Sequence, residues 1–116
     1  MSAARTSLAK LLSRAAVRAL ARPANFRYGE AIYKRGGVEF IRYETALVEG
    51  WVGGLAGSVA GGGSQRRRTR LFVQGKDLRW YCAGNPKNHQ IFCKHCVALA
   101  LAILREEVRR RRRNLR

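Results

Sequence analysis

Acidic residues are scarce in this chain of 116 residues, which has 7 Asp and Glu against 24 Lys and Arg. The formal net charge is therefore +17. Such an imbalance favours polyanion partners, namely DNA, RNA or an acidic membrane surface. A GC-rich genome, which enriches Ala, Gly and Arg together, is an alternative origin of the same composition.

Long apolar runs and scattered cysteines are also missing. No stretch approaches the roughly 18 apolar residues of a transmembrane helix, so we expect a cytoplasmic protein that has no membrane partner. All 3 cysteines lie in one window, whereas a disulfide framework spreads an even number along the chain. A phosphate-binding loop of the type G-x-x-x-x-G-K-[ST] is absent, and we expect no small-molecule substrate. A standalone accessory or adapter role follows.

The apolar fraction of 47% indicates one folded domain rather than a disordered chain. Residues 1–22 form its first segment, a basic amphipathic helix that ends near Arg22-Pro23. The apolar positions that recur at steps of three and four are Leu8, Leu11, Leu12, Ala15, Ala19 and Leu20. No acid precedes Glu30, a pattern that also describes a transit peptide, so a targeting role for this segment stays open.

The second segment, residues 23–104, opens with a shorter helix. Asn25 is its expected N-cap, and Gly36-Gly37 ends it. The texture then changes to β-branched and aromatic residues, and VEFIRY and TALVEGWVG predict two strands. A glycine-rich loop follows, and we expect four arginines at its far end, Arg66, Arg67, Arg68 and Arg70. RLFV and LRWYC predict two more strands, joined by a turn at Gly75-Lys76.

The run CVALALAILREEVRR predicts the longest helix, and residues 105–116 form an arginine-rich arm beyond its apolar part. The predicted fold class is α+β, with two N-terminal helices, a small antiparallel sheet, and a zinc-finger turn that leads into the C-terminal helix.

Every soft metal ligand of the chain lies in YCAGNPKNHQIFCKHCVALAL. Cys93 and His95 are one residue apart at the start of the predicted last helix, and Cys82 ends a predicted strand. A structural zinc site takes four Cys or His ligands in a tetrahedron. Cys82, Cys93 and His95 are therefore three candidate ligands, gathered from a strand end and a helix start.

This spacing resembles the SWIM-type zinc finger of bacterial proteins, whose pattern is C-x-C, a variable gap, then C-x-H. FCKHCVALALAIL resembles the hydrophobic helix entry of that family, and the upstream NFRYGEAIYKRGGVEFI resembles the stretch that often precedes the finger. The likeness runs from Val17 to Leu104. It implies a small zinc-binding module that binds DNA or proteins, in a family often found beside helicase, transposase or ubiquitin-ligase domains.

The chain departs from that family at Gly84, where the second cysteine of the C-x-C pair is expected. Three possibilities remain for the fourth position. His89, between the two ligand pairs, is the first candidate. Cys96 is the second, although in family members with the sequence CKHC this cysteine is not counted among the ligands. The third is a water molecule, or the loss of metal binding altogether.

An open coordination position is also a feature of catalytic zinc sites, but those need a general base beside the metal-bound water. No acidic residue lies between Asp77 and Glu106, so we expect no enzymatic activity.

The expected nucleic-acid partner is DNA, bound with weak sequence specificity. The expected mechanism is neutralisation of phosphates, with an affinity that falls steeply with salt. The expected contacts are the cations Arg66, Arg67, Arg68, Arg70, Lys87, Lys94, Arg109, Arg110, Arg111, Arg112 and Arg113. Trp80 and Tyr81 are candidates for stacking on bases, unless strand alternation packs one of them into the core. The rival function is protein interaction, in which Val97, Leu101 and Leu104 dock on a larger DNA-processing enzyme. A degenerate finger without metal is the third.

Overall fold

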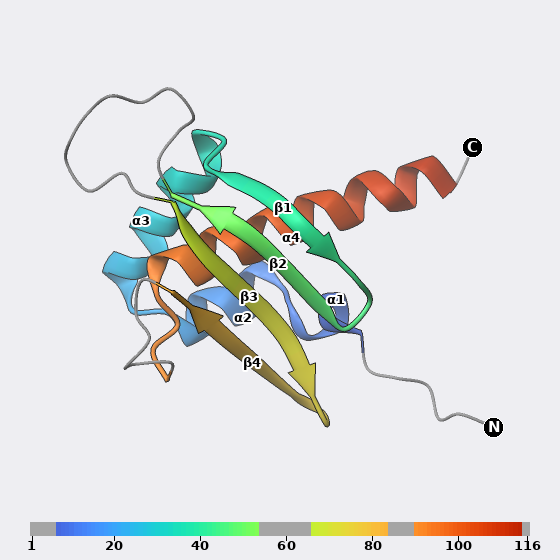
Figure 1. The fold of residues 1–116 in the computed structure, drawn as a ribbon, viewed down its shortest axis with the longest axis horizontal. Helices are drawn as coiled ribbons and strands as arrows, with labels where there is room; N and C mark the ends of the chain where they lie inside the picture. Colours follow the sequence, from blue (N-terminus) through green and yellow to red (C-terminus); the bar gives the residue numbers. More distant parts are fainter. Residues whose placement is uncertain (1–6, 54–65, 84–89, 115–116) are drawn as a thin grey trace.

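The computed structural model describes residues 7–53, 66–83 and 90–114. Its elements follow the α+β class expected from the sequence (Figure 1). In chain order they are α1 (Leu8–Leu11), α2 (Arg14–Leu20), α3 (Pro23–Lys34), β1 (Val38–Tyr43), β2 (Leu47–Val52), β3 (Arg67–Gln74), β4 (Asp77–Cys82) and α4 (Lys94–Asn114). No helix in these described ranges is both long enough and apolar enough to cross a membrane.

The four strands form one antiparallel sheet in the order β1-β2-β3-β4. The turn between β3 and β4 lies at Gly75-Lys76, as predicted, because Gln74 pairs with Asp77. Gly75 has a φ of 66°, a left-handed conformation that glycine adopts without strain. The glycine-rich loop predicted before β3 lies mostly outside the described residues.

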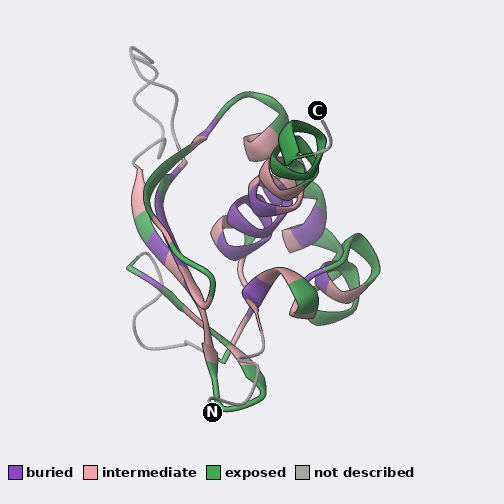
Figure 2. Cartoon of the chain, turned by 90° about the vertical axis from the view of Figure 1, so that its right-hand side faces the viewer, coloured by how far each residue is buried: buried purple, intermediate pink, exposed green. Residues whose placement is uncertain are grey.

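One face of the sheet packs on the helices, and α4 runs across its centre (Figures 1 and 2). The core lies between them and includes Val48, Val52 and Leu71 from the sheet. From α4 it includes every residue from Cys96 to Leu101, together with Ile103. Val97 and Leu101 are buried, and Leu104 is half-buried against this core. Two of the three residues expected to dock on a partner, Val97 and Leu101, are therefore covered within this chain, and Val97 faces α3 at Gly29.

The helix α3 lies close against α4 at Gly29. A Cβ atom at this position would lie 2.5 Å from Val97 Cβ and 2.6 Å from the Lys94 carbonyl oxygen. The helix begins at Pro23, with Arg22 as its N-cap, so the N-cap predicted at Asn25 is wrong. Proline fits the first helical position because its missing N–H would have no partner there. The helix ends at Lys34, just before Gly36 with its φ of 76°, so the stop predicted at the two glycines is confirmed.

A single N-terminal helix is expected over residues 1–22, but the described part, residues 7–22, holds two short helices. Ser13 interrupts the expected helix, and its Oγ accepts a hydrogen bond from the Ala16 N–H at 3.0 Å, as an N-cap does. The break changes which side chains face the core. Ala15, Ala19 and Leu20 are exposed, whereas the buried apolar positions are Leu8, Leu12, Val17 and Ala21.

Two groups of arginines lie on regular elements. Arg67, Arg68 and Arg70 are part of β3, so their expected position on a loop is wrong. The reason is that Thr69 and Leu71 alternate with these arginines and are fully buried. Their side chains face the core, so the segment is a strand of the sheet. The run Arg109 to Arg113 belongs to the last turns of α4, which continues without a break to Asn114.

Candidate metal centre

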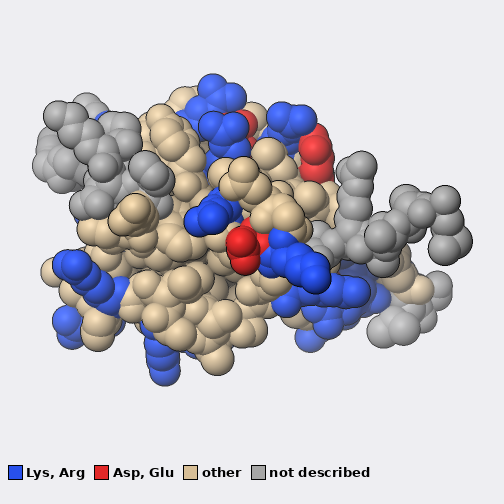
Figure 3. Space-filling view, turned by 90° about the horizontal axis from the view of Figure 1, so that it is seen from below, with Lys and Arg blue, Asp and Glu red and all other residues tan. Residues whose placement is uncertain are grey.

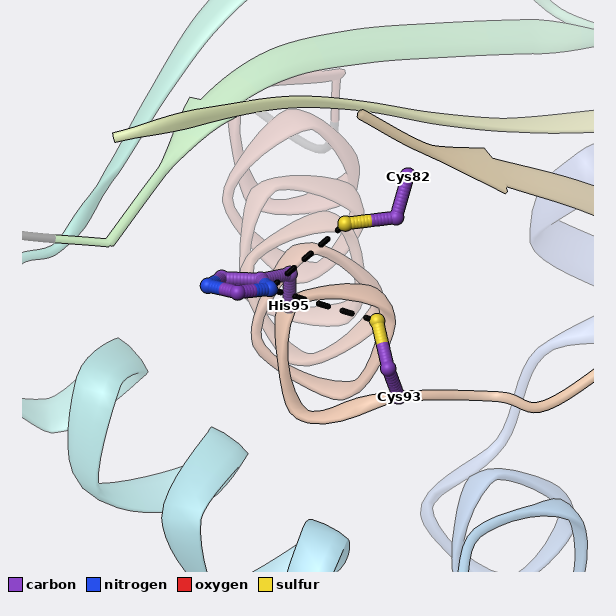
Figure 4. Close-up of side chains that lie close together, drawn as sticks. All are labelled: Cys82, Cys93 and His95. Carbon is purple, nitrogen blue, oxygen red and sulfur yellow. Dashed lines mark hydrogen bonds between the residues drawn. The ribbon is translucent and has the colours of Figure 1, made fainter. Parts of the chain in front are cut away.

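Three candidate ligands come together from two elements. Cys82 is the last residue of β4, Cys93 directly precedes α4, and His95 lies in the first turn of that helix. Their side chains point toward one another (Figure 4). Cys82 Sγ lies 3.5 Å from His95 Nδ1, and Cys93 Sγ lies 4.0 Å from the same nitrogen. All three ligand atoms lie within 4.8 Å of one another.

These distances fit the ligand set of a tetrahedral zinc site. With Zn–S bonds of about 2.3 Å and Zn–N bonds of about 2.0 Å, a sulfur and a nitrogen ligand lie about 3.5 Å apart in a regular tetrahedron. The separation between Cys82 and His95 matches this length, and that between Cys93 and His95 exceeds it by a few tenths of an ångström. Thiolate and imidazole are also the donors that zinc prefers. Nδ1 of His95 is the atom that would bind the ion.

Cys82 is fixed by its pairing in the sheet. It lies opposite Thr69 of β3, a residue that is itself fully buried. The Thr69 hydroxyl lies 3.7 Å from Cys82 Sγ and 3.2 Å from the Arg67 carbonyl oxygen, so its proton can go to either acceptor. The next residue continues the ladder, since the Ala83 N–H donates to the Arg68 carbonyl at 2.9 Å. The sheet therefore sets the position of this sulfur.

Cys93 is held through the two residues before it. Trp80 of β4 donates its indole N–H to the Ile91 carbonyl oxygen at 3.1 Å. Its ring also meets the buried Phe92 edge-on, with 5.0 Å between the centroids. The Cys93 carbonyl in turn accepts the Val97 N–H at 3.0 Å and so begins α4. Trp80 thus ties the approach to α4 to the strand that carries Cys82.

Both thiols hold their protons firmly when no metal is bound. The hydrogen bond with Cys93 and then burial raise the pKa of Cys82 to about 12. For Cys93 the hydrogen bond with Cys82 lowers the pKa, but its contact with Cys96 and its burial together raise it above the ordinary value. A cation at this site would displace both protons, since thiolate is the form that binds metal.

Cys96 is not a member of this cluster. Its side chain is fully buried in the core, and its Sγ lies 3.7 Å from Cys93 Sγ. Among the described residues, the His, Cys, Asp and Glu side chains that converge on the site are those of Cys82, Cys93 and His95. His89, the other candidate for a fourth ligand, lies outside the described residues, as does Gly84.

Several of the cations expected to contact phosphate are paired with acids. Arg68 donates two hydrogen bonds to Glu49, at 3.0 and 3.2 Å, and Arg70 lies 3.9 Å from the same carboxylate. The other ion pairs on this list are Arg66 with Glu39, and Arg110 and Arg113 with Glu106. Lys87 lies outside the described residues, and Lys94 is exposed at the start of α4.

The basic side chains do not form one continuous surface on the face that Figure 3 draws. On the face drawn in Figure 3, Lys and Arg lie in separate groups with uncharged surface between them. The start of β3 and the end of α4 are at opposite ends of the molecule in Figure 1, so the two arginine groups are far apart.

Trp80 and Tyr81 lie on opposite faces of the sheet, as expected for neighbouring residues of a strand. Trp80 packs toward Phe92 and is half-buried, so it is the one of the two stacking candidates that strand alternation turns toward the core. Tyr81 is exposed on the other face of the sheet, under the guanidinium of Arg70. Sequence reasoning missed Trp51, which is exposed on that same face, and the structural role of Trp80. The alternation of side chains along a strand shows that Trp51 and Trp80 each lie on one face of the sheet. Which face that is follows only from the register of the strands.

Comparison of the chain with known protein families, with curated proteins and with solved structures found no match.

Proposed function

We propose that this protein is a small zinc-binding module of the SWIM type that binds nucleic acid as an accessory to larger DNA-processing proteins. The observation that carries the proposal is the convergence of Cys82, Cys93 and His95, with all ligand atoms within 4.8 Å. Two thiolates and an imidazole are a soft donor set, which favours zinc over hard cations such as magnesium or calcium.

The role of the metal in this proposal is structural. It links the end of β4 to the start of α4, two elements that residues 83–93 separate in the chain. Binding free energy at such a site adds to the folding free energy when the unfolded chain lacks the arrangement. Of the possibilities for the fourth position we favour His89 over a water molecule, and Cys96 is fully buried and is not part of the cluster among the described residues.

The nucleic-acid role rests on charge. The formal net charge of +17 supports binding to a polyanion, and the exposed run Arg109 to Arg113 offers closely spaced guanidinium groups on the last turns of α4. Contacts of this kind neutralise phosphates and release counterions, so they depend strongly on salt and weakly on sequence.

A salt titration tests this role. Binding of a fluorescent DNA duplex is measured by anisotropy across a series of KCl concentrations, for the wild type and for Arg111→Gln/Arg112→Gln/Arg113→Gln. Loss of three phosphate contacts should reduce the slope of log K against log salt by about 3. The matched control removes three exposed cations of α3, Arg27→Gln/Lys34→Gln/Arg35→Gln, at the same net charge. Equal losses in both variants would contradict the assigned contacts, and no binding by the wild type would contradict the nucleic-acid role.

A further inference from the structure

The sheet has a second face that the described helices do not cover (Figure 2). Val48, Gly50 and Val52 of β2 point toward α4, so the residues between them point away from it. The register of the strands extends this open face across β3 and β4. Three aromatic residues and three arginines lie on it, namely Trp51, Arg68, Arg70, Phe72, Arg79 and Tyr81.

Each aromatic residue on this open face lies directly opposite an arginine. Trp51 pairs with Arg68, Tyr81 pairs with Arg70, and Phe72 pairs with Arg79. Directly opposed residues have their Cβ atoms about 4.5–5.5 Å apart. A molecule lying on the face would therefore meet a flat ring and a positive charge at each of three neighbouring positions.

The rings and the charges are accessible. Trp51 is 40% exposed and Tyr81 is 36% exposed. The Arg70 guanidinium carbon lies 5.4 Å from the centre of the Tyr81 ring, within the range of a cation–π contact. Large aromatic side chains left in water lose the free energy that burial would give them, so a ligand that covers both rings is favoured.

Glu49 holds two of the arginines in place. Its side chain is only 9% exposed, and its carboxylate accepts two hydrogen bonds from Arg68 while lying 3.9 Å from Arg70. Glu49 thus balances only one of the two guanidinium charges beside it, and Glu39 of β1 lies opposite Trp51 on the same face. The Nε atom of Arg70 is buried and, among the described residues, makes no hydrogen bond.

A hollow continues the open face past Phe72. It has a volume of about 480 Å³ and is lined by Phe72, Gln74, Arg79, Trp80 and Gln90. Its lining combines the aromatic ring of Phe72 with two amides and a guanidinium. Such groups can hold a flat heterocycle by stacking and by hydrogen bonds to its edge.

We propose that the open face binds a short single strand of nucleic acid, with bases stacked on Trp51 and Tyr81 and phosphates held by Arg68 and Arg79. This inference rests on the proposed nucleic-acid function and names its substrate and its surface. A single strand is favoured over a duplex because only unpaired bases expose their ring faces to protein side chains. The excess of positive charge matches a polyanion, whereas an apolar or basic peptide would meet unpaired charge on the same surface.

Fluorescence gives a direct test of the contact. The zinc-loaded protein is titrated with a single-stranded oligonucleotide of about 12 nucleotides, as DNA and as RNA, and with the matching DNA duplex. Stacking on Trp51 should quench the tryptophan emission with the single strands and not with the duplex. Trp51→Phe should keep the affinity, measured by anisotropy, and lose the quenching. Quenching that persists in this variant would overturn the proposal.

Affinity gives the second test. Trp51→Leu and Tyr81→Leu should each weaken single-strand binding by about 10-fold, the loss expected for one stacked base. The matched control is Tyr28→Leu, which removes the exposed tyrosine of α3 and should leave the affinity unchanged. Melting curves of each variant show that it is folded at the temperature of the assay.

The outcomes separate this proposal from the function on which it rests. Failure to bind any nucleic acid contradicts both. Equal binding of duplex and single strand, insensitive to Trp51 and Tyr81 variants, contradicts only the open face. Strong binding of a peptide or of the chain's own residues 54–65 at this face, in place of the single strand, contradicts it too.

Discussion

Cys82 Sγ lies 3.5 Å from His95 Nδ1, although the two residues are separated by 13 positions in the sequence. One atom belongs to the end of a strand and the other to the first turn of the helix that covers the sheet. This contact places a thiol and an imidazole at the separation of two ligands in a zinc tetrahedron. The metal account depends on this relationship, with Cys93 as the third ligand.

Zinc binding should release two protons per chain near pH 7. The pKa values of Cys82 and Cys93 are both raised above the ordinary thiol value, so both groups carry protons when metal is absent. The apparent affinity should therefore rise by about 100-fold for each pH unit between pH 7 and 8. Calorimetric titrations in buffers of different ionisation enthalpy count the protons. Cys82→Ser, which lacks one of the two thiols, should lose most of the zinc binding and with it the proton release, and a pH-independent affinity in the wild type would contradict thiolate ligation.

Trp80→Ala should weaken zinc binding by about 10-fold or more. The substitution removes the hydrogen bond to Ile91 and the contact with Phe92 that together position Cys93. Residues that orient ligands in this way typically contribute 10- to 100-fold in metal affinity. Competition with a chromogenic chelator measures the change. Trp51→Ala is the matched control, a tryptophan on the opposite face of the sheet, and it should bind zinc as the wild type does.

Gly29→Ala should lower the free energy of unfolding by about 1–2 kcal/mol. The added Cβ atom would meet Val97 Cβ at 2.5 Å, and overpacking of this kind costs about 1–3 kcal/mol. Replacement of glycine by alanine in a helix returns at most about 1 kcal/mol. Denaturant unfolding measures the difference. Arg27→Ala, at an exposed site on the same helix, should change stability by less than about 0.5 kcal/mol.

The ion pair between Arg14 and Glu30 should appear as a lowered carboxyl pKa. The hydrogen bond from Arg14 is the main cause, and burial opposes it, so the pKa of Glu30 lies below its usual 4.5. A lowered pKa stabilises the fold above about pH 4.5, and this contribution is lost as the pH falls through the folded value. Carboxyl chemical shifts followed by NMR across acid pH give that value directly.

In Arg14→Gln, the pKa of Glu30 should return toward 4.5. Arg18→Gln is the matched control, because Arg18 lies over the same Phe26 ring but its charge acts on Glu30 only from a distance. An equal rise in both variants would mean that general charge, and not the hydrogen bond, lowers the pKa.

The strands and the ligand cluster were the features most accessible from the sequence. VEFIRY predicts β1 with both its ends, because its β-branched and aromatic residues follow directly on two glycines. Gly75 marks the β3–β4 turn, and the cysteines and histidine mark the cluster that joins β4 to α4. These features depend on local sequence, so no tertiary information was needed to place them.

The errors share one cause, which is that contacts between distant residues decided the outcome. The run of arginines before Leu71 looks like the end of a loop, but pairing with β2 makes it a strand and brings Arg68 to Glu49. Ser13 caps a second helix, so the expected continuous helix is interrupted. The second helix starts at a position that buries Val17 in the core. The apolar side of α4 is buried between the sheet and α3, with Leu99 near Gly50 and Val97 against Gly29.

The most direct test of the central claim is the zinc content of the purified protein, measured by plasma mass spectrometry together with its melting temperature before and after chelation. The account predicts one zinc per chain in the wild type and in Cys96→Ser, and little or none in Cys82→Ser or His95→Ala. It predicts weaker retention in His89→Ala and a lower melting temperature without metal. A wild-type protein that holds no zinc under reducing conditions, and melts at the same temperature with and without a chelator, would contradict the metal centre.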